Sequence, residues 1–268
     1  MLNYITWTAD PELFNFWIIH VRWYGLLFAS GFAIGYYLTQ RLFQAEKLPE
    51  EWLDYLLIVM VLGAIVGARL GHVFFYQWDY YQDNLAEIPM IWKGGLASPG
   101  GAIGIFIGLW LFSRYVSKKP ILWSSDRLAM SVALTGCMIR LGNLMNHEIV
   151  GAPSEVPWAF LFTRYEVDPV PRHPSQLYEA IAYLLIFIVL FWCYWRTDLK
   201  QRLGYLTGLF FVLVFGARFL IEFVKEVQVS KELEMTLNLG QWLSIPLILI
   251  GLYLMFRPKV LAPTHPRK

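Results

Sequence analysis

Two short stretches of the sequence place charged and amide side chains among apolar neighbours. One contains Arg140, Asn143 and His147, and the other contains Arg218 and Glu222. At helical spacing the first three share one face, and the last two are four residues apart, which is the spacing of an ion pair on a helix. A guanidinium is always charged and binds oxyanions through two parallel hydrogen bonds. Two arginines in apolar surroundings therefore favour a ligand that carries a phosphate.

The composition indicates a membrane protein with several spans. Of the 268 residues, 57% are hydrophobic and 16% are charged, whereas about a quarter of the residues of a soluble domain are charged. A net charge of +2 gives no indication of a nucleic-acid partner. Helices that cross a bilayer need about 20 mostly apolar residues. Seven segments meet this requirement, at about 20–39, 52–75, 96–115, 127–145, 177–195, 203–222 and 239–256.

These segments predict an all-α fold in which residues 1–268 form one transmembrane domain. The long connection at about 146–176 is rich in proline and aromatic residues and is predicted to form a small external cap. Loops at one end of the spans hold Lys118, Lys119 and Arg202 among thirteen basic residues, and those at the other end hold five. Because basic loops stay in the cytoplasm, the N-terminus is predicted outside and the C-terminus inside.

With this orientation, polar residues from six spans fall in one outer layer. They are Arg22, Tyr24, Arg69, His72, Arg140, Asn143, Asn146, His147, Glu148, Arg218 and Glu222, together with residues 94–101 and 171–179. Ionisable groups within a membrane normally face a cavity or a partner. On one helix alone, structural ion pairs and snorkelling arginines would explain them. Their convergence from six helices favours an outward-facing polar cavity within the membrane.

Glycine pairs flank the start of the third span, at 94–95 and at Gly100-Gly101. Backbone N–H groups at a helix N-terminus bind anions, but glycines also let helices pack closely. Close packing is favoured for Gly104 and Gly108, which repeat at GxxxG spacing, and both interpretations stand for the pairs. A ligand that has a phosphate and stays in the bilayer is a phospholipid.

Six motifs in the chain are specific enough to indicate a family. They are RWYG at 22–25, WKGGLAS-x-GGAIG at 92–104, R-x-x-N-x-x-N-x-E-x-x-G at 140–151, RHPSQLYEA at 172–180, ARFLIEF at 217–223 and LGQWLSIP at 239–246. In this order they resemble the phosphatidylglycerol–prolipoprotein diacylglyceryl transferases over nearly the whole chain.

The resemblance implies a multi-pass enzyme of the bacterial inner (cytoplasmic) membrane, with seven helices, an external cap and an outward-facing active site. Such an enzyme moves the diacylglyceryl group of phosphatidylglycerol to the lipobox cysteine thiol of a prelipoprotein. It forms a thioether and releases glycerol phosphate, as the first step of lipoprotein maturation. The implied partners are phosphatidylglycerol, prelipoproteins and the lipid bilayer. No cofactor and no metal are expected, because His147-Glu148 lacks the second histidine of the HExxH pattern.

The positions that match functional residues of the family are Tyr24, Arg140, Asn143, Glu148, Gly151, Arg218 and Glu222. Two positions depart from the pattern. Pro99 stands where the family has a histidine, and Val214-Phe215 stands where it has a tyrosine. The general base is therefore open: no base, His147 or His72 are the alternatives.

The chemistry assigns a role to each matching residue. Arg140 and Arg218 are predicted to stabilise the charge of the leaving phosphate, with Glu222 orienting Arg218. Asn143 and Tyr24 are predicted to bind the lipid head group. The remaining predictions are that Glu148 orients Arg140 or acts as a base, and that substrate binding involves Arg140, Asn143, Gly151, Gly100 and Gly101.

Two other functions remain open at this point. One is a catalytically impaired or divergent relative of the family, because Pro99 replaces the histidine. The other is an outward-facing lipid transporter or binding protein. Transporters more often have internal repeats with broken helices at the bilayer midplane, and no such pairing occurs in the sequence.

Overall fold

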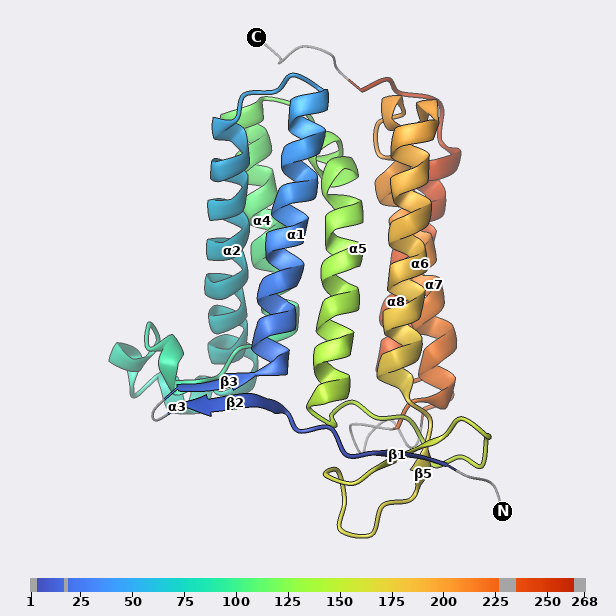
Figure 1. The fold of residues 1–268 in the computed structure, drawn as a ribbon. Helices are drawn as coiled ribbons and strands as arrows, with labels where there is room; N and C mark the ends of the chain where they lie inside the picture. Colours follow the sequence, from blue (N-terminus) through green and yellow to red (C-terminus); the bar gives the residue numbers. More distant parts are fainter. Residues whose placement is uncertain (1–3, 17–18, 227–234, 263–268) are drawn as a thin grey trace. The chain divides into compact units, whose positions relative to one another are not determined.

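The computed structural model describes residues 4–16, 19–226 and 235–262, and most of its regular structure is helical (Figure 1). The chain divides into two compact units. Unit 1 comprises Met1–Leu38 and Asp126–Leu261, and unit 2 comprises Thr39–Ser125 and Ala262–Lys268.

Each predicted span overlaps one long α-helix, although the first begins with three residues of a strand and the third continues past its α-helix into a short helical segment. The α-helices are α1 (Trp23–Ala45), α2 (Glu51–Tyr76), α3 (Trp78–Tyr81), α4 (Ser98–Leu111), α5 (Ile121–Met145), α6 (Ser175–Arg196), α7 (Tyr205–Ile221) and α8 (Leu239–Phe256). Short helical turns of other types are η1 (Leu85–Glu87), η2 (Ile91–Lys93), η3 (Phe112–Ser117), η4 (Asp198–Gln201) and η5 (Glu222–Val224).

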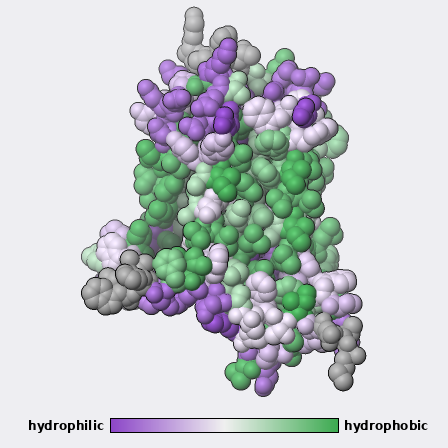
Figure 2. All heavy atoms as spheres, viewed as in Figure 1, coloured by the Kyte–Doolittle hydropathy of each residue, from purple (hydrophilic) through white to green (hydrophobic). Residues whose placement is uncertain are grey.

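Six helical segments of the described chain are long and apolar enough to cross a membrane. They are Glu51–Tyr76, Pro99–Ser117, Ile121–Met145, Ser175–Arg196, Tyr205–Val224 and Leu239–Phe256. The first predicted span, α1, has 23 residues but is not among the six, because its tyrosines, Gln40 and Arg41 lower its hydropathy. Hydrophobic side chains gather along the middle of the helices and hydrophilic ones near their ends (Figure 2).

The prediction of a mostly helical fold is confirmed, but an all-α class is incomplete. Short strands occur outside the long helices: β1 (Ile5–Trp7), β2 (Glu12–Phe16), β3 (Ile19–Arg22), β4 (Phe160–Phe162) and β5 (Pro171–Arg172). The sequence did not predict them, because two to five residues carry little periodicity, and the partner of β1 lies far along the chain.

In unit 2, glycines on α2 and α4 face one another. A Cβ added at Gly67 would lie 2.7 Å from the Cα of Gly104, and one added at Gly71 would lie 2.6 Å from the Cα of Gly100. Helices packed this closely have no room for a side chain at the contact. The packing interpretation therefore applies to Gly100 as well as to Gly104.

In unit 1, α1 and α5 pack through small and hydroxyl residues. The Ser131 hydroxyl donates to the carbonyl of Gly35, and the Thr135 hydroxyl donates to the carbonyl of Gly31, both at 3.1 Å. Hydroxyl groups that bond across helices in this way stabilise association in an apolar environment. This contact holds the start of α1 close to α5, which carries Arg140.

A buried carboxylate joins α5 to the start of α7. Asp126 accepts hydrogen bonds from the backbone N–H of Gly204 at 2.6 Å and of Thr207 at 2.8 Å, and from the Thr207 hydroxyl at 2.7 Å. N–H groups in the first turn of a helix lack partners within the helix, and they favour a negative charge. Asp126 therefore caps α7 from another helix.

The predicted cap also includes residues near the N-terminus. Strand β1 pairs in parallel with β4, which pairs antiparallel with β5. The indole N–H of Trp7 donates to the Leu144 carbonyl at 3.1 Å. Phe160 and Phe162 of β4 form a buried apolar cluster with Leu144 and Val150. The cap is therefore attached to the end of α5.

The glycine contact of unit 2 generates a prediction about folding. In Gly104→Ala the new methyl group overlaps the Gly63 carbonyl, so the variant should lose about 1–3 kcal/mol of unfolding free energy. Thermal unfolding of the purified protein in detergent measures this. Gly101→Ala is the matched control, because its Cβ would lie 3.5 Å from its nearest neighbours in α2. Equal stability of the two variants would contradict the predicted contact.

Candidate functional site

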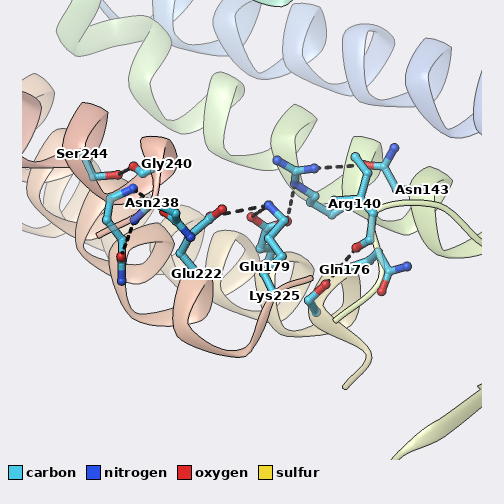
Figure 3. A network of polar contacts seen from close by, with 12 residues as sticks. Arg140, Asn143, Gln176, Glu179, Glu222, Lys225, Asn238, Gly240 and Ser244 are labelled. Atoms are coloured by element: carbon cyan, nitrogen blue, oxygen red, sulfur yellow. Dashed lines mark hydrogen bonds and ion pairs between the residues drawn. The ribbon is translucent and has the colours of Figure 1, made fainter. Parts of the chain in front are cut away.

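Arg140 lies near the end of α5 and is held by two side chains (Figure 3). Its Nε lies 2.7 Å from Oε2 of Glu179, and its Nη1 donates to Oδ1 of Asn143 at 3.2 Å. The side chain of Arg140 is 15% exposed. The contact with Asn143 is the one that helical spacing predicts, whereas the carboxylate comes from α6.

Glu148 reaches Arg140 only through an amide. Its Oε1 accepts from Nδ2 of Asn143 at 2.7 Å and from Nδ2 of Asn146 at 3.3 Å. Because Asn143 accepts from the guanidinium with one side-chain atom and donates to the carboxylate with the other, it relays orientation between them. Glu148 can therefore orient Arg140 only indirectly, through the side chain of Asn143.

The turn after α5 is held by the first residues of α6. The Gln176 amide donates to the backbone carbonyl of Glu148 at 2.6 Å, and the Ser175 hydroxyl donates to that of Ile149 at 2.8 Å. His147 and Ile149 have φ values of 54° and 58°, which non-glycine residues rarely adopt. These bonds stabilise a turn that its own residue types do not favour.

His147 faces the cap. Its Nε2 lies 2.9 Å from the backbone carbonyl of Ala9, and its ring packs edge-on against Phe162 at 6.0 Å between centroids. The residue is buried. Because a carbonyl only accepts, Nε2 donates the hydrogen bond. His147 thereby connects the N-terminal segment to the end of α5.

Tyr24 begins α1 and packs against α5. A Cβ added at Gly142 would lie 2.8 Å from the ring of Tyr24. Electrostatic interactions link the Tyr24 hydroxyl to Glu148 and Arg140. The structure therefore brings together four predicted site residues from α1, α5 and the turn after α5: Tyr24, Arg140, Asn143 and Glu148.

The sequence analysis missed Glu179 as a functional residue. Its side chain has no exposed surface, and its second carboxylate oxygen lies 3.5 Å from Nζ of Lys225. A buried carboxylate without cationic partners would be very costly. One signal was available, because Glu179 lies in the first turns of a span within the motif RHPSQLYEA.

The predicted ion pair between Arg218 and Glu222 is not formed. Glu222 instead lies 3.6 Å from Nζ of Lys225, on a helical turn that follows α7. Its carboxylate covers the Cα of Gly240 in α8, where an added Cβ would lie 2.7–2.9 Å from the carboxylate atoms. Within the described residues, Arg218 has neither an ion pair nor a side-chain hydrogen bond.

Arg218 nevertheless belongs to the same electrostatic environment as Arg140. Tyr183, one turn after Glu179 on α6, interacts electrostatically with Glu179, Arg140 and Arg218. The aromatic ring of Tyr183 packs on Gly136 of α5. Tyr183 of α6 is therefore within electrostatic range of both arginines.

Gly151, predicted to bind substrate, lies at a crossing of three backbone segments. Its N–H donates to the His173 carbonyl at 2.9 Å, and it pairs with Lys225 in an isolated β-bridge. An added Cβ would lie 2.5 Å from His173 and 2.7 Å from the Val224 carbonyl. This close approach requires a residue without a side chain.

Arg172 fixes the same crossing from the cap. Its Nε and Nη2 contact the Glu166 carboxylate and its Nη1 contacts Glu226, each at 3.0 Å. The Arg172 guanidinium lowers the pKa of the Glu166 carboxyl from its usual value. Nη1 also donates to the Gly151 carbonyl at 3.3 Å. The cap and the segment after α7 are therefore held to Gly151 by charge as well as by backbone pairing.

The other predicted polar residues belong to unit 2. Arg69 is buried and donates to the backbone carbonyls of Glu87, Ile88, Gly94 and Gly95 at 2.5–3.3 Å. Gly94 and Gly95 have positive φ values of 84° and 75°. Their carbonyls face a guanidinium, so this loop accepts hydrogen bonds from Arg69, and the arginine is structural.

His72 and the pair Gly100-Gly101 also lie in unit 2. His72 Nε2 lies 3.0 Å from the Gln77 side-chain oxygen. Gly100 and Gly101 are in the first turn of α4, with Gly100 against α2. Their predicted role in substrate binding stays a prediction.

Comparison with known proteins points to one family. Residues 11–257 match the family model described as prolipoprotein diacylglyceryl transferase. The chain is 46% identical over 255 residues to a phosphatidylglycerol–prolipoprotein diacylglyceryl transferase of Chloroherpeton thalassium, which covers 95% of this chain and 94% of that protein. It is 48% identical over 249 residues to the protein of the same name from Tolumonas auensis, covering 93% and 95% of the two chains.

The buried carboxylate of Glu179 gives a prediction about stability. Glu179→Gln leaves Arg140 and Lys225 without their shared anion, so the unfolding free energy should fall by about 3–5 kcal/mol. Thermal unfolding in detergent measures it. Asp10→Asn is the matched control, because Asp10 pairs with Arg164 at 2.8 Å on the exposed surface, and such pairs contribute about 1 kcal/mol or less. A loss as small as that of the control would contradict the prediction.

Proposed function

The chain belongs to the prolipoprotein diacylglyceryl transferase family, and from this premise we propose that its site transfers a diacylglyceryl group to a cysteine thiol. The donor is phosphatidylglycerol and the acceptor is a prelipoprotein, as the names of the relatives state. The protein is a transferase, and glycerol phosphate leaves as the second product.

The observation that carries this proposal is the difference between the two arginines in their bonding partners. Arg140 is held by Glu179 and Asn143, whereas Arg218 forms no ion pair within the described residues. An uncompensated guanidinium that is half-buried in a largely apolar unit needs an anion. The phosphate of the lipid supplies one, and a guanidinium matches the geometry of its oxygens.

The reaction requires one bond to form and one to break. The thiol sulfur attacks the glyceryl carbon next to the phosphate, and the carbon–oxygen bond to the phosphate breaks with its electron pair left on oxygen. Negative charge then increases on the leaving phosphate. Arg140 and Arg218 stabilise this charge, and because Arg140 is already oriented, little reorganisation is needed during the reaction.

The thiol must also lose its proton, because the thiolate is the nucleophile and an ordinary cysteine has a pKa of about 8.5. This part of unit 1 holds three cations, Arg140, Arg218 and Lys225, and three carboxylates, Glu148, Glu179 and Glu222. The cluster is therefore close to neutral, which weakens the case for deprotonation by a positive field alone.

A carboxylate base fits this charge balance better. Glu179 and Glu222 contact Lys225. The Oε1 atom of Glu148 accepts from two amides, and its Oε2 has no bonding partner within the described residues. We therefore assign Glu148 Oε2 as the acceptor of the thiol proton. In this proposal His147 is not the base; it stabilises the turn after α5 through its contacts with Ala9 and Phe162.

The proposal includes a location. The proposed location is the inner membrane, with α1 as a seventh span, the N-terminus outside, the C-terminus inside and the site facing outward; six helical segments long and apolar enough to cross a membrane support it. The excess of Lys and Arg in the loops at one end of the spans supports this orientation. The acceptor cysteine is that of a lipobox, presented at the outer end of the spans.

The experiment that tests the function is complementation of a bacterial strain depleted of its own transferase. In parallel, the purified protein is given phosphatidylglycerol and a lipobox peptide. We expect growth to be rescued, glycerol phosphate to be released and the peptide to gain the mass of one diacylglyceryl group. Failure of all three with normal protein levels would overturn the proposal and leave lipid binding without transfer.

The two arginines give a prediction about catalysis. Arg140→Lys and Arg218→Lys retain the charge but lose the planar pair of donors. Each should lower kcat/KM for phosphatidylglycerol at least about tenfold, which corresponds to about 1.4 kcal/mol of transition-state stabilisation. Release of glycerol phosphate is the readout. Arg164→Lys, on the exposed surface of the cap, is the control, and a loss equal to that of the control would make both site arginines structural.

A further inference from the structure

Lys225 stands between two carboxylates, one of which orients Arg140 while the other has no role in the catalytic proposal. Its Nζ lies 3.5 Å from Glu179 Oε1 and 3.6 Å from Glu222 Oε2 (Figure 3). The Lys225 side chain is 5% exposed. A lysine buried to this degree is normally paired, and both of its ionic partners belong to the site.

The backbone fixes the direction of the Lys225 side chain. Lys225 is extended and forms a β-bridge with Gly151. On one side of it the Val224 carbonyl accepts from the N–H of Ala152 at 2.9 Å, and on the other the N–H of Glu226 donates to the Val150 carbonyl at 3.3 Å.

Successive side chains of an extended segment point to opposite sides. The side chain of Glu226, the residue after Lys225, therefore points away from that of Lys225. The Glu226 carboxylate turns to Arg172 at 3.0 Å in the cap and accepts from the Tyr165 hydroxyl. Lys225 therefore projects the other way, toward Glu179 and Glu222.

Glu222 is confined from its other side by α8. Its carboxylate lies over the Cα of Gly240, where any side chain would collide with it. Gly240 is the second residue of α8, which begins with a capping box formed by Asn238 and Gln241. A backbone surface and a cation thus define the position of the carboxylate.

Glu222 has an alternative partner on its own helix. Arg218 is four residues earlier, and oppositely charged side chains at this spacing attract one another. Arg140 and Lys225 form ion pairs with Glu179 and Glu222, and Arg218 is the one of these three cations that has no ionic partner within the described residues. If Lys225 were neutral, Glu222 would carry an uncompensated charge next to an uncompensated guanidinium, and the two would pair.

We propose that Lys225 is a positioning residue that holds Glu222 away from Arg218 and so leaves Arg218 available to the phosphate of the lipid. This inference rests on the proposed function, since it takes the phosphate as the ligand of Arg218. It gives Lys225 an electrostatic role that does not require contact with the substrate. It also assigns Gly151 the task of placing Lys225.

The test measures binding of glycerol phosphate, the product, to the purified full-length protein in detergent. We expect Lys225→Met to bind at least tenfold more weakly than the parent protein, because Glu222 then competes with the phosphate for Arg218. Lys225→Arg retains the cation and should stay within threefold of the parent. Arg164→Met is the control for loss of a cation elsewhere in unit 1, and should bind like the parent.

A double variant distinguishes the positioning of Glu222 by Lys225 from direct contact of Lys225 with the phosphate and from a role in folding. Lys225→Met with Glu222→Gln removes both the cation and the competing carboxylate, so binding should return to within threefold of the parent. Binding as weak as that of the single variant would overturn the proposal, because Lys225 would then contact the phosphate or support the fold. Parent-like binding by Lys225→Met alone would also overturn it.

Glu222→Gln alone keeps the proposal falsifiable if Lys225→Met does not fold. It should bind glycerol phosphate at least as tightly as the parent, and weaker binding would overturn the inference. Transfer to the lipobox peptide is measured on the same samples. Absence of transfer by the parent protein together with the expected pattern of binding would refute the proposed function and leave the role of Lys225 standing for a phosphate ligand.

Discussion

The Glu179 carboxylate is the charge around which the other charged side chains of the site are arranged. It has no exposed surface, and it contacts cations from α5 and from the segment after α7. A carboxylate removed from water is tolerated only when oppositely charged groups replace the lost hydration. Glu179 therefore fixes Arg140 and Lys225 at once, and through them Asn143 on one side and Glu222 on the other.

Glycines determine how closely the segments that carry these charges approach. At Gly151 three segments cross with no space for a side chain, and this crossing sets the register of Lys225. At Gly240 the backbone of α8 forms a surface for the Glu222 carboxylate. Two glycines with no chemistry of their own thus control the position of two charged groups. Their effect on the site is steric, and it acts through the backbone.

Pairing among the charges separates structural cations from those that can bind a ligand. Arg69 donates its hydrogen bonds to backbone carbonyls in unit 2, and Arg172 pairs with Glu166 in the cap and with Glu226 after α7. Lys225 is shared by Glu179 and Glu222. Arg218 lacks such partners within the described residues, and an anionic ligand would complete its environment. A guanidinium in an apolar protein binds phosphate most strongly when no carboxylate competes for it.

The sequence by itself determined the features that depend on neighbours along the chain. The lengths of the apolar runs predicted the long helices, and helical spacing predicted the contact of Arg140 with Asn143, because both arise within one helix. The motifs predicted the family. Only the tertiary structure decided the ionic partners, because the β-bridge to Gly151 sets the direction of Lys225 and Glu179 comes from another helix. Glu222 therefore pairs with Lys225 and not with Arg218, and Glu179 joins α6 to Arg140.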